Sequence, residues 1–503
     1  MEQKDIEALK SRMCGKMSFG TAGVRTKMEA GFCRLNDLTI LMLTHGFAAW
    51  AKLAANVFVH NGIKVYLFSK CCPTPLVSYA TIGFNCDAGL MITASHNPKQ
   101  DNGYKAYWTN GAQILAPHDS EICRLAYENM EPKAEYWDMS KFAEHPLLHS
   151  ADSIMEKYFT EELFLCRYKS LNEKCPVKFT YTAFHGVGVP YMTRMLKDFG
   201  FPSENIIIVQ EHGEPNPDFP TVPFPNPEEG RKVFTIPIAT ADKHNSSIIL
   251  ANDPDADRFQ LAEKQPKGDW KIFTGNEMGA LISWWIWHCW REQNPQKDPS
   301  NLYIINSAVS SSISRTIATM EVDWFYAGSA LDKDGITAAA TFAELTSYLY
   351  SKELTLAQQL LNIYNKYGFH LIRSSYWFVP NQTVMRNIFG KLLPAKIGKF
   401  DIKYVRDLTI GYDNEQPGNK PILPLSTSSE MITFTLSDGS WATIRASGTE
   451  PKIKYYIELK SLPGKTKKDL IDIERQLAEL EQTVVDNLLE PKLMALLKDA
   501  EII

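Results

Sequence analysis

The chain has 503 residues, of which 44% are hydrophobic and 22% are charged, and its net charge is -5 with both signs interspersed. This length exceeds what a single hydrophobic core organises, so about two to four domains are expected. This composition and net charge are those of an ordinary soluble globular protein. They favour neither a nucleic acid nor a membrane as partner, whereas a small anionic substrate is compatible with them.

Cysteine usage and the N-terminus predict a cytosolic protein. Nine cysteines lie between Cys14 and Cys289, with an odd count, no C-x-x-C pair and two neighbours at Cys71 and Cys72. This pattern favours reduced thiols over a disulfide framework or a zinc site. The first residues lack the apolar core of a secretory signal. The most apolar stretch, residues 279–290, is too short to span a bilayer and predicts a buried helix.

Over the first two-thirds of the chain, short apolar runs alternate with amphipathic patterns. This alternation predicts several α/β units with mostly parallel sheets. The predicted strands are residues 65–68, 89–92, 178–182, 206–209, 247–251 and 302–305. The predicted helices are residues 118–130, 190–199, 228–243, 277–291 and 335–350.

The last third has a different pattern. Residues 431–436 and 453–459 alternate as strands do, and residues 467–489 carry apolar side chains at helical spacing. A separate α+β domain is therefore expected. Turn-forming residues at 132–148, 213–227 and 413–428 predict linkers or surface loops.

A serine lies directly after the predicted strand that ends at Ile92, in the segment Thr93-Ala94-Ser95-His96-Asn97-Pro98. Ligands of open α/β sheets bind beyond the carboxyl ends of strands, so Ser95 is a candidate nucleophile. A serine needs a base or a metal to act in this way. The alternative is a simple turn or helix cap, which these residue types also favour.

An acidic segment, Asn252-Asp253-Pro254-Asp255-Ala256-Asp257-Arg258, follows the predicted strand 247–251. Three carboxylates at alternate positions repel one another unless a cation lies among them, and oxygen-only ligands suit Mg²⁺. The alternatives are a solvated acidic turn or a Ca²⁺ loop. The glutamate that ends an EF-hand loop is absent here, and a strand rather than a helix leads in.

A third segment, Arg445-Ala446-Ser447-Gly448-Thr449-Glu450-Pro451-Lys452, follows a strand through Thr443. Its backbone N–H groups and hydroxyls can form an anion nest, and Arg445 can grip a phosphate with two hydrogen bonds. An ordinary β-turn is the alternative.

Weaker signals surround these three segments. Residues 20–25, 185–188 and 275–277 predict ligand loops or turns, and Lys105 lies close in sequence to Ser95. Lys105 would act as a proton shuttle if burial lowered its pKa, and is otherwise a surface charge. A serine loop, an acidic metal loop and a phosphate nest together are the parts that phosphoryl transfer requires.

The three segments TASHNP, DPDADR and RASGTEPK resemble the signatures of the α-D-phosphohexomutase superfamily. The runs NPEEG, LDKDGI, MITFT and SGTEPKIKYY resemble its phosphoglucomutase-2 type, the phosphopentomutases and phosphoglucomutases. The resemblance extends from about Phe19 to the C-terminal helix, in the same order.

The resemblance implies an α/β fold of three mixed or parallel-sheet domains and a C-terminal α+β domain around a central cleft. Domain 1 (1–160) would hold the phosphoserine loop, domain 2 (161–274) the metal loop, domain 3 (275–375) the sugar-recognition residues and domain 4 (376–503) the phosphate-binding loop. The implied activity interconverts sugar 1-phosphates with sugar 5- or 6-phosphates in a cytoplasmic monomer. Its sugars would be ribose, deoxyribose and glucose.

The resemblance also implies roles for individual residues. Ser95 would carry the phosphoryl group, with Lys105 and His96 as the other catalytic residues. Mg²⁺ would bridge the phosphate on Ser95 to Asp253, Asp255 and Asp257, and glucose 1,6-bisphosphate would act as activator. The implied substrate-binding residues are Arg25, Arg258, Glu277, Arg445, Ser447, Gly448, Thr449 and Lys452.

Two departures from the family pattern accompany the match. Trp50 runs directly into Ala51 where members carry a strand, and Ala330 joins Leu331 where members carry a sugar-selecting loop with two glutamates. The chain thus resembles a variant that lacks two internal segments, with domains 1 and 3 incomplete. Loss of buried strands costs a domain much of its net stability. A glucose 1,6-bisphosphate synthase, a catalytically impaired sugar-phosphate binding protein and a hydrolytic phosphatase are the alternatives.

Overall fold

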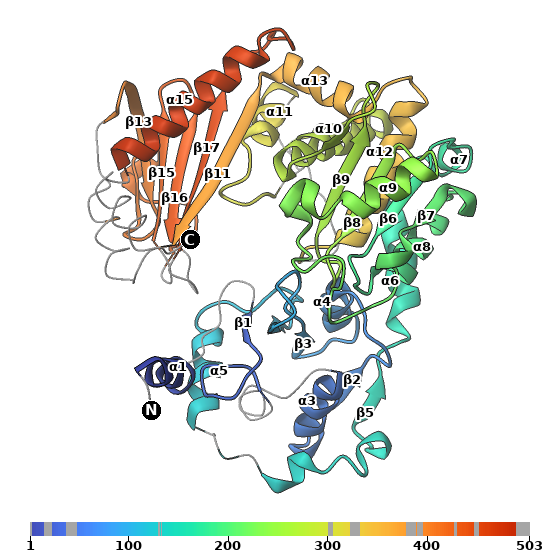
Figure 1. Ribbon diagram of the computed structural model, residues 1–503. Coiled ribbons are helices and arrows are strands. Elements are labelled where there is room, and N and C mark those ends of the chain that lie inside the picture. The colour runs from blue at the N-terminus through green and yellow to red at the C-terminus, as the bar shows by residue number, and fades with distance from the viewer. Residues whose placement is uncertain are drawn as a thin grey trace. The chain divides into compact units, whose positions relative to one another are not determined.

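A computed structural model (Figure 1) divides the chain into two compact units, residues 1–274 with 328–355, and residues 275–327 with 356–503. The boundary between residues 274 and 275 is also one of those predicted from the sequence. The finer division into four domains stays a prediction. The structure describes residues 3–14, 23–36, 48–128, 131, 133–299, 305–321, 332–378, 389, 396–426, 430–446 and 452–488.

The first part of unit 1 contains two small sheets. One is antiparallel with the strand order β1-β4-β3, and the other is a parallel pair of β2 and β5. The expectation of mostly parallel sheets is therefore wrong for the sheet that carries Ser95. The elements are α1 (Gln3–Met13), β1 (Val24–Lys27), α3 (Ala48–His60), β2 (Val65–Leu67), α4 (Thr74–Gly83), β3 (Ala88–Ile92), β4 (Asp101–Trp108), α5 (His118–Glu128), η1 (Ala134–Trp137), η2 (Phe142–Glu144), β5 (Leu148–Ser150) and α6 (Ile154–Glu162).

The junction between Trp50 and Ala51 lies inside a continuous helix, α3. That helix and η2 cover the β2–β5 pair through a small buried cluster of Ala55, Val59 and Phe142. In the described part of this region, no strand joins β2–β5 to β1-β4-β3. This division agrees with the expectation that the sheet of domain 1 lacks an element.

The second part of unit 1 is built on one five-stranded sheet with the order β10-β9-β8-β6-β7. Strands β7, β6 and β8 are parallel, β9 is antiparallel to β8, and β10 is antiparallel to β9. Every residue of β6 and β8 is buried, as expected for strands covered on both faces. The elements are η3 (Leu163–Leu165), α7 (Lys169–Asn172), β6 (Phe179–Thr182), α8 (Gly188–Asp198), η4 (Ser203–Asn205), β7 (Ile206–Ile208), η5 (Gln210–His212), η6 (Pro227–Lys232), α9 (Thr235–Lys243), β8 (Ile248–Asn252), β9 (Phe259–Lys264), β10 (Trp270–Ile272) and α12 (Gly335–Tyr350).

The helix predicted over residues 228–243 is only partly correct. A 3-10 segment, η6, precedes α9, and Gly230 inside it has a φ of 67°, in the left-handed region. A right-handed helix cannot pass through that conformation, so the regular helix begins only at Thr235.

The described part of unit 2 combines four α-helices with an antiparallel sheet. In Figure 1, α15 lies across the sheet formed by β13, β15, β16, β17 and β11. Buried Ile473, Leu477, Leu480 and Val484 form the apolar stripe of α15, which confirms the expected α+β arrangement. The elements are α10 (Gly275–Gln293), α11 (Ile313–Glu321), α13 (Leu356–Tyr367), β11 (His370–Phe378), β12 (Lys396–Ile397), β13 (Phe400–Asp407), β14 (Tyr412–Asp413), η7 (Pro417–Asn419), β15 (Met431–Leu436), β16 (Trp441–Ala446), β17 (Lys452–Lys460) and α15 (Leu470–Leu488).

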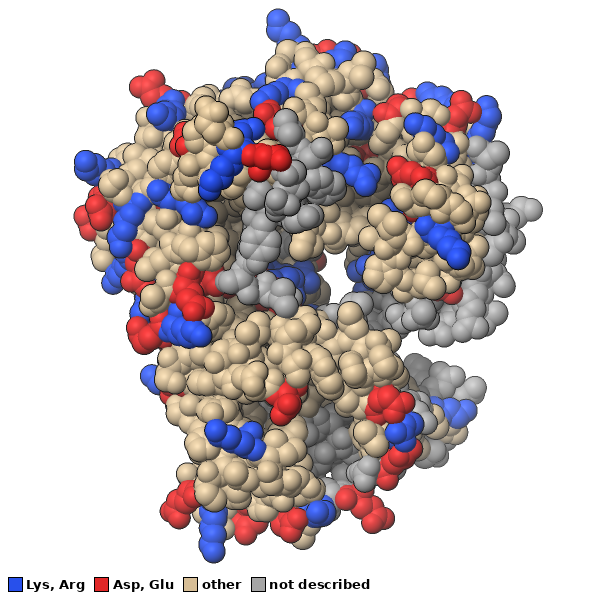
Figure 2. Space-filling view, turned by 180° about the vertical axis from the view of Figure 1, so that it is seen from behind, with Lys and Arg blue, Asp and Glu red and all other residues tan. Residues whose placement is uncertain are grey.

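The apolar stretch at residues 279–290 lies within α10, where Leu281, Trp285 and Trp287 are buried, as predicted. Among the described helices, none combines the length and the apolar character that crossing a bilayer requires. On the face drawn in Figure 2, basic and acidic side chains are interspersed. Most of the predicted strand 302–305 lies outside the described residues.

Candidate active site

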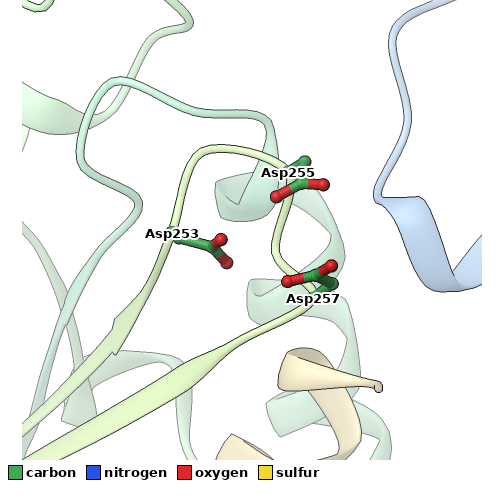
Figure 3. Close-up of side chains that lie close together, drawn as sticks. All are labelled: Asp253, Asp255 and Asp257. Atoms are coloured by element: carbon green, nitrogen blue, oxygen red, sulfur yellow. The ribbon is translucent and has the colours of Figure 1, made fainter. Parts of the chain in front are cut away.

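The three aspartates lie on the loop that connects β8 to β9. This loop, residues 253–257, is called the acidic loop below, and Figure 3 shows its three side chains. Asp253, Asp255 and Asp257 are 0%, 5% and 2% exposed, and one oxygen of each lies within 4.8 Å of the others. Ala256 has a φ of 55°, so the loop bends sharply between the last two aspartates. Buried carboxylates this close repel one another strongly without a cation.

Lys105 is the described cation closest to this group. Its Nζ donates to Asp255 Oδ2 at 2.6 Å and to Asp257 Oδ2 at 2.7 Å, and its side chain is fully buried. The hydroxyl of Thr74 donates to the same oxygen of Asp255 at 2.5 Å. Lys333 approaches Asp257 Oδ2 at 3.1 Å.

The second carboxylate oxygens of Asp255 and Asp257 have different surroundings. Asp255 Oδ1 and Asp257 Oδ1 are buried and make no hydrogen bond. A buried acceptor without a partner is costly, and two anionic oxygens beside a third carboxylate are the ligands that a hard divalent cation prefers. The residues present therefore fit a metal ion of this kind.

Ser95 lies on the loop after β3, and β4 brings Lys105 beside it. Ser95 is buried, with a φ of 59°, and its Oγ donates to Asp253 Oδ2 at 2.7 Å. His96 Nδ1 lies 3.2 Å from the same Oγ. The serine loop and the acidic loop, 158 positions apart in the chain, therefore meet at one point.

Burial and mutual repulsion shape the charges of the site. Burial and then the charges of Asp255 and Asp257 raise the pKa of Asp253 well above its ordinary value. Burial acts the same way on Asp255, but the charge and hydrogen bond of Lys105 outweigh it and lower the pKa of Asp255. Burial, with Arg258 and Arg25, lowers the pKa of His96 to about 3, so its imidazole is neutral at pH 7.

The condition under which Lys105 would shuttle protons is not met. Burial tends to lower the pKa of Lys105, but Asp255 and Asp257 outweigh burial and raise it. An ammonium held by two carboxylates is a poor base, so this geometry favours a role in positioning the aspartates.

Two arginines predicted to bind substrate also lie near the serine loop. Arg25, on β1, donates to Asn97 Oδ1 at 3.3 Å. The backbone N–H of Arg258 donates to Asp253 Oδ1 at 2.9 Å. Both guanidinium groups lower the pKa of His96, which places positive charge beside Ser95, as an anionic substrate requires.

The other predicted site residues that the structure describes belong to unit 2. Glu277 is in the first turn of α10, Arg445 is on β16, and Lys452 begins β17, all in unit 2. Ser447, Gly448 and Thr449 lie outside the described residues. The phosphate-binding role of this segment stays a prediction.

Sequence reasoning missed two residues that contact the aspartates, Thr74 and Lys333. Thr74 begins α4, and Lys333 precedes α12 in the LDKDGI run. A threonine at the start of a helix that follows a strand is a weak signal, since most such residues only cap the helix. Lys333 lies within LDKDGI, one of the runs that resemble the family, but the sequence by itself assigns no role to this lysine.

Two family models and several known proteins match this chain. Residues 48–133 match the family model for phosphoglucomutase/phosphomannomutase alpha/beta/alpha domain I, and residues 156–268 match the model for domain II. Phosphopentomutase of Mus musculus is 41% identical over 574 residues, covering 98% of this chain and 92% of that protein. Glucose 1,6-bisphosphate synthase of Homo sapiens is 39% identical over 560 residues, covering 96% and 89%.

A solved structure supports the fold. The open form of the phosphoglucomutase parafusin from Paramecium has a TM-score of 0.60 at 15% identity, covering 95% of this chain and 96% of its own. The alignment with the mouse protein spans 574 positions against the 503 residues of this chain, so at least 71 of these positions have no counterpart here. This difference agrees with the expectation of missing internal segments.

Proposed function

The chain belongs to the phosphoglucomutase/phosphomannomutase family, and we propose that it interconverts sugar 1-phosphates with sugar 5- or 6-phosphates through a phosphoserine at Ser95. The observation that carries this proposal is the hydrogen bond from Ser95 Oγ to Asp253 within a buried triad of aspartates. The relatives named phosphopentomutase support this class of reaction.

In the proposed reaction, the phosphoryl group moves from Ser95 Oγ to a free hydroxyl of the sugar phosphate. The Oγ–P bond breaks, a new O–P bond forms, and the proton of the sugar hydroxyl passes to Ser95 Oγ, which yields a sugar bisphosphate and a free serine. The other phosphoryl group then returns to Ser95. Because little covalent chemistry falls to the protein, positioning and charge neutralisation supply most of the catalysis.

The surrounding residues have distinct tasks in this proposal. Asp253 orients Ser95 Oγ through the 2.7 Å hydrogen bond, and the neutral imidazole of His96 lies beside the same oxygen, at 3.2 Å. Asp253, Asp255 and Asp257 would hold Mg²⁺, which when bound would neutralise charge on the transferred phosphoryl group. Arg25 and Arg258 would attract the anionic substrate.

A second candidate is a glucose 1,6-bisphosphate synthase, because relatives with that name match almost as well as the phosphopentomutases. It would use the same serine and the same aspartates. A synthase accumulates the bisphosphate and needs a second phosphoryl donor, whereas a mutase needs only a trace of bisphosphate as activator.

The test is an assay with Mg²⁺, a trace of glucose 1,6-bisphosphate and either ribose 1-phosphate or glucose 1-phosphate. We expect isomerised product, and we expect Ser95→Ala to reduce its rate at least about a thousand-fold. Ser203→Ala, at an exposed serine, is the matched control. Full activity in Ser95→Ala would overturn the proposal, and the ratio of the two rates would identify the preferred sugar.

We also propose that the protein acts in the cytosol. All nine cysteines are free thiols in the structure, and the buried Cys72, Cys175 and Cys289 form no disulfide. Reduced thiols are typical of that compartment.

A further inference from the structure

Three consecutive backbone carbonyls of the acidic loop are each bound by a different segment of the chain. Each of the three carbonyls accepts a hydrogen bond from one backbone N–H. The three donor residues are more than 100 positions apart from one another along the chain. The pairs are Val187 to Pro254 at 2.9 Å, Thr74 to Asp255 at 2.9 Å and Gly335 to Ala256 at 3.1 Å.

Each of these donors is at the N-terminus of a helix. Val187 is the N-cap of α8, while Thr74 and Gly335 are the first residues of α4 and α12. The first N–H groups of a helix have no partner inside it and carry partial positive charge. Three such ends converging on a loop with three carboxylates offset part of its negative charge.

Two glycines permit this close approach. A Cβ on Gly186 would lie 2.2 Å from Cα and O of Pro254, and a Cβ on Gly335 would lie 2.3 Å from the carbonyl oxygen of Arg258. Neither glycine is in the left-handed region, so an alanine there would be strained by contact alone. A side chain at either position would push the backbone of the acidic loop out of place.

We propose that Gly186 and Gly335 are positioning residues that hold the acidic loop in its metal-binding geometry before any metal arrives. With the backbone held by the three helix ends, Asp255 Oδ1 and Asp257 Oδ1 stay buried and without a hydrogen bond, available to a cation. This inference rests on the proposed function only in taking the three aspartates as the metal site.

The first experiment compares Gly186→Ala and Gly335→Ala with Gly213→Ala. Gly213 lies in the same unit, and the nearest atom to its added Cβ is at an ordinary 3.4 Å. Mg²⁺ binding is measured by calorimetric titration, and folding by circular dichroism. We expect Mg²⁺ to bind about 10 to 100 times more weakly to the first two variants, and within about two-fold of wild type to the third.

A purely structural role would give a different result. It would lower the melting temperature of Gly186→Ala and Gly335→Ala equally in EDTA and in Mg²⁺, with Mg²⁺ affinity unchanged, and this would overturn the inference. If the wild-type protein bound no Mg²⁺, both the proposed function and this inference would fail. If the wild type bound Mg²⁺ and the two variants bound it equally well, only the inference would fail.

Hydrogen exchange on the unmodified protein decides the question even if both variants fail to fold. In EDTA, we expect the amide protons of Thr74, Val187 and Gly335 to be protected at least about 100-fold against exchange, because the loop carbonyls already hold them. Exchange at the rate of unprotected amides in EDTA, with protection only after Mg²⁺ is added, would contradict a loop positioned in advance.

Discussion

Unit 1 contains two regions of different completeness. The divided-sheet region, residues 23–162, has two small sheets, and all three residues of its strand β2 are only half-buried. The five-stranded region, residues 163–274 with 332–355, has one continuous sheet, and every residue of its strand β6 is buried. The apolar cluster under β2–β5 has three buried members, whereas a cluster on the five-stranded sheet has nine.

The active-site geometry nevertheless draws on both regions. Ser95 and Lys105 come from the divided-sheet region and bond to Asp253, Asp255 and Asp257 of the five-stranded region. Contacts between the two regions therefore bring the site residues together. We therefore expect the site to depend on a few buried polar contacts more than on the sheet behind Ser95.

The largest effect is expected from breaking those contacts. Lys105→Met leaves Asp255 and Asp257 buried without their cation, which costs about 3–5 kcal/mol. Lys99→Met is the matched control, because Lys99 also joins the two regions, through Asp218 at 3.1 Å, but at an exposed position. Chemical denaturation and Mg²⁺ titration measure the two variants.

We expect Lys105→Met to depend on Mg²⁺ for stability far more than wild type, since the metal then supplies the missing positive charge. Lys99→Met should behave as wild type, because exposed ion pairs contribute little. Equal destabilisation by both substitutions would contradict the view that the buried contacts hold the regions together.

A smaller effect is expected in the difference between equal truncations in the two apolar cores. Phe179→Ala removes a fully buried ring of the five-stranded sheet that packs on Phe201, at a cost of about 3–5 kcal/mol. Phe142→Ala, in the small cluster under β2–β5, should cost less than about half as much, because the looser surroundings can collapse around the gap. Denaturant unfolding of each variant measures the difference. Equal costs would mean that the divided-sheet region is as tightly packed as its neighbour.

The smallest effect concerns pH and His212 of the five-stranded region. Burial, with a contribution from His185, lowers the pKa of His212 to about 4. The unfolded chain then binds a proton at its ordinary pKa of about 6.5 while the folded chain does not, so stability falls as the pH drops from about 6.5 toward 4. The slope is about 1.4 kcal/mol per pH unit.

His212→Gln should remove this component of acid sensitivity, whereas His149→Gln, at an exposed position on β5, should leave it in place. Unfolding curves between pH 7 and about pH 4.5 compare the variants. An unchanged slope in His212→Gln would show that other groups cause the acid sensitivity.

The sequence was most informative where pattern and chemistry are local. The buried strand β8, the aspartates that follow it, helix α12 and strand β15 were all predicted within about one residue of their observed bounds. Strand β4, which carries Lys105, was missed because its turn-forming Asp101-Asn102-Gly103 start resembles a loop. The helix predicted from residue 228 was wrong at its start because of the left-handed Gly230.

Local order of residue types was enough to indicate the phosphohexomutase family, the candidate nucleophile Ser95 and the acidic loop, because short motifs carry that chemistry within a few residues. Only the tertiary structure could decide what Lys105 and Thr74 do, since the partners of Lys105 lie 150 or more positions away along the chain and that of Thr74 lies 181 positions away. The same holds for Gly186 and Gly335, whose missing side chains matter only because another backbone passes within about 2.3 Å of where a Cβ would be. Contacts of this kind depend on how distant segments pack, and no local pattern encodes them.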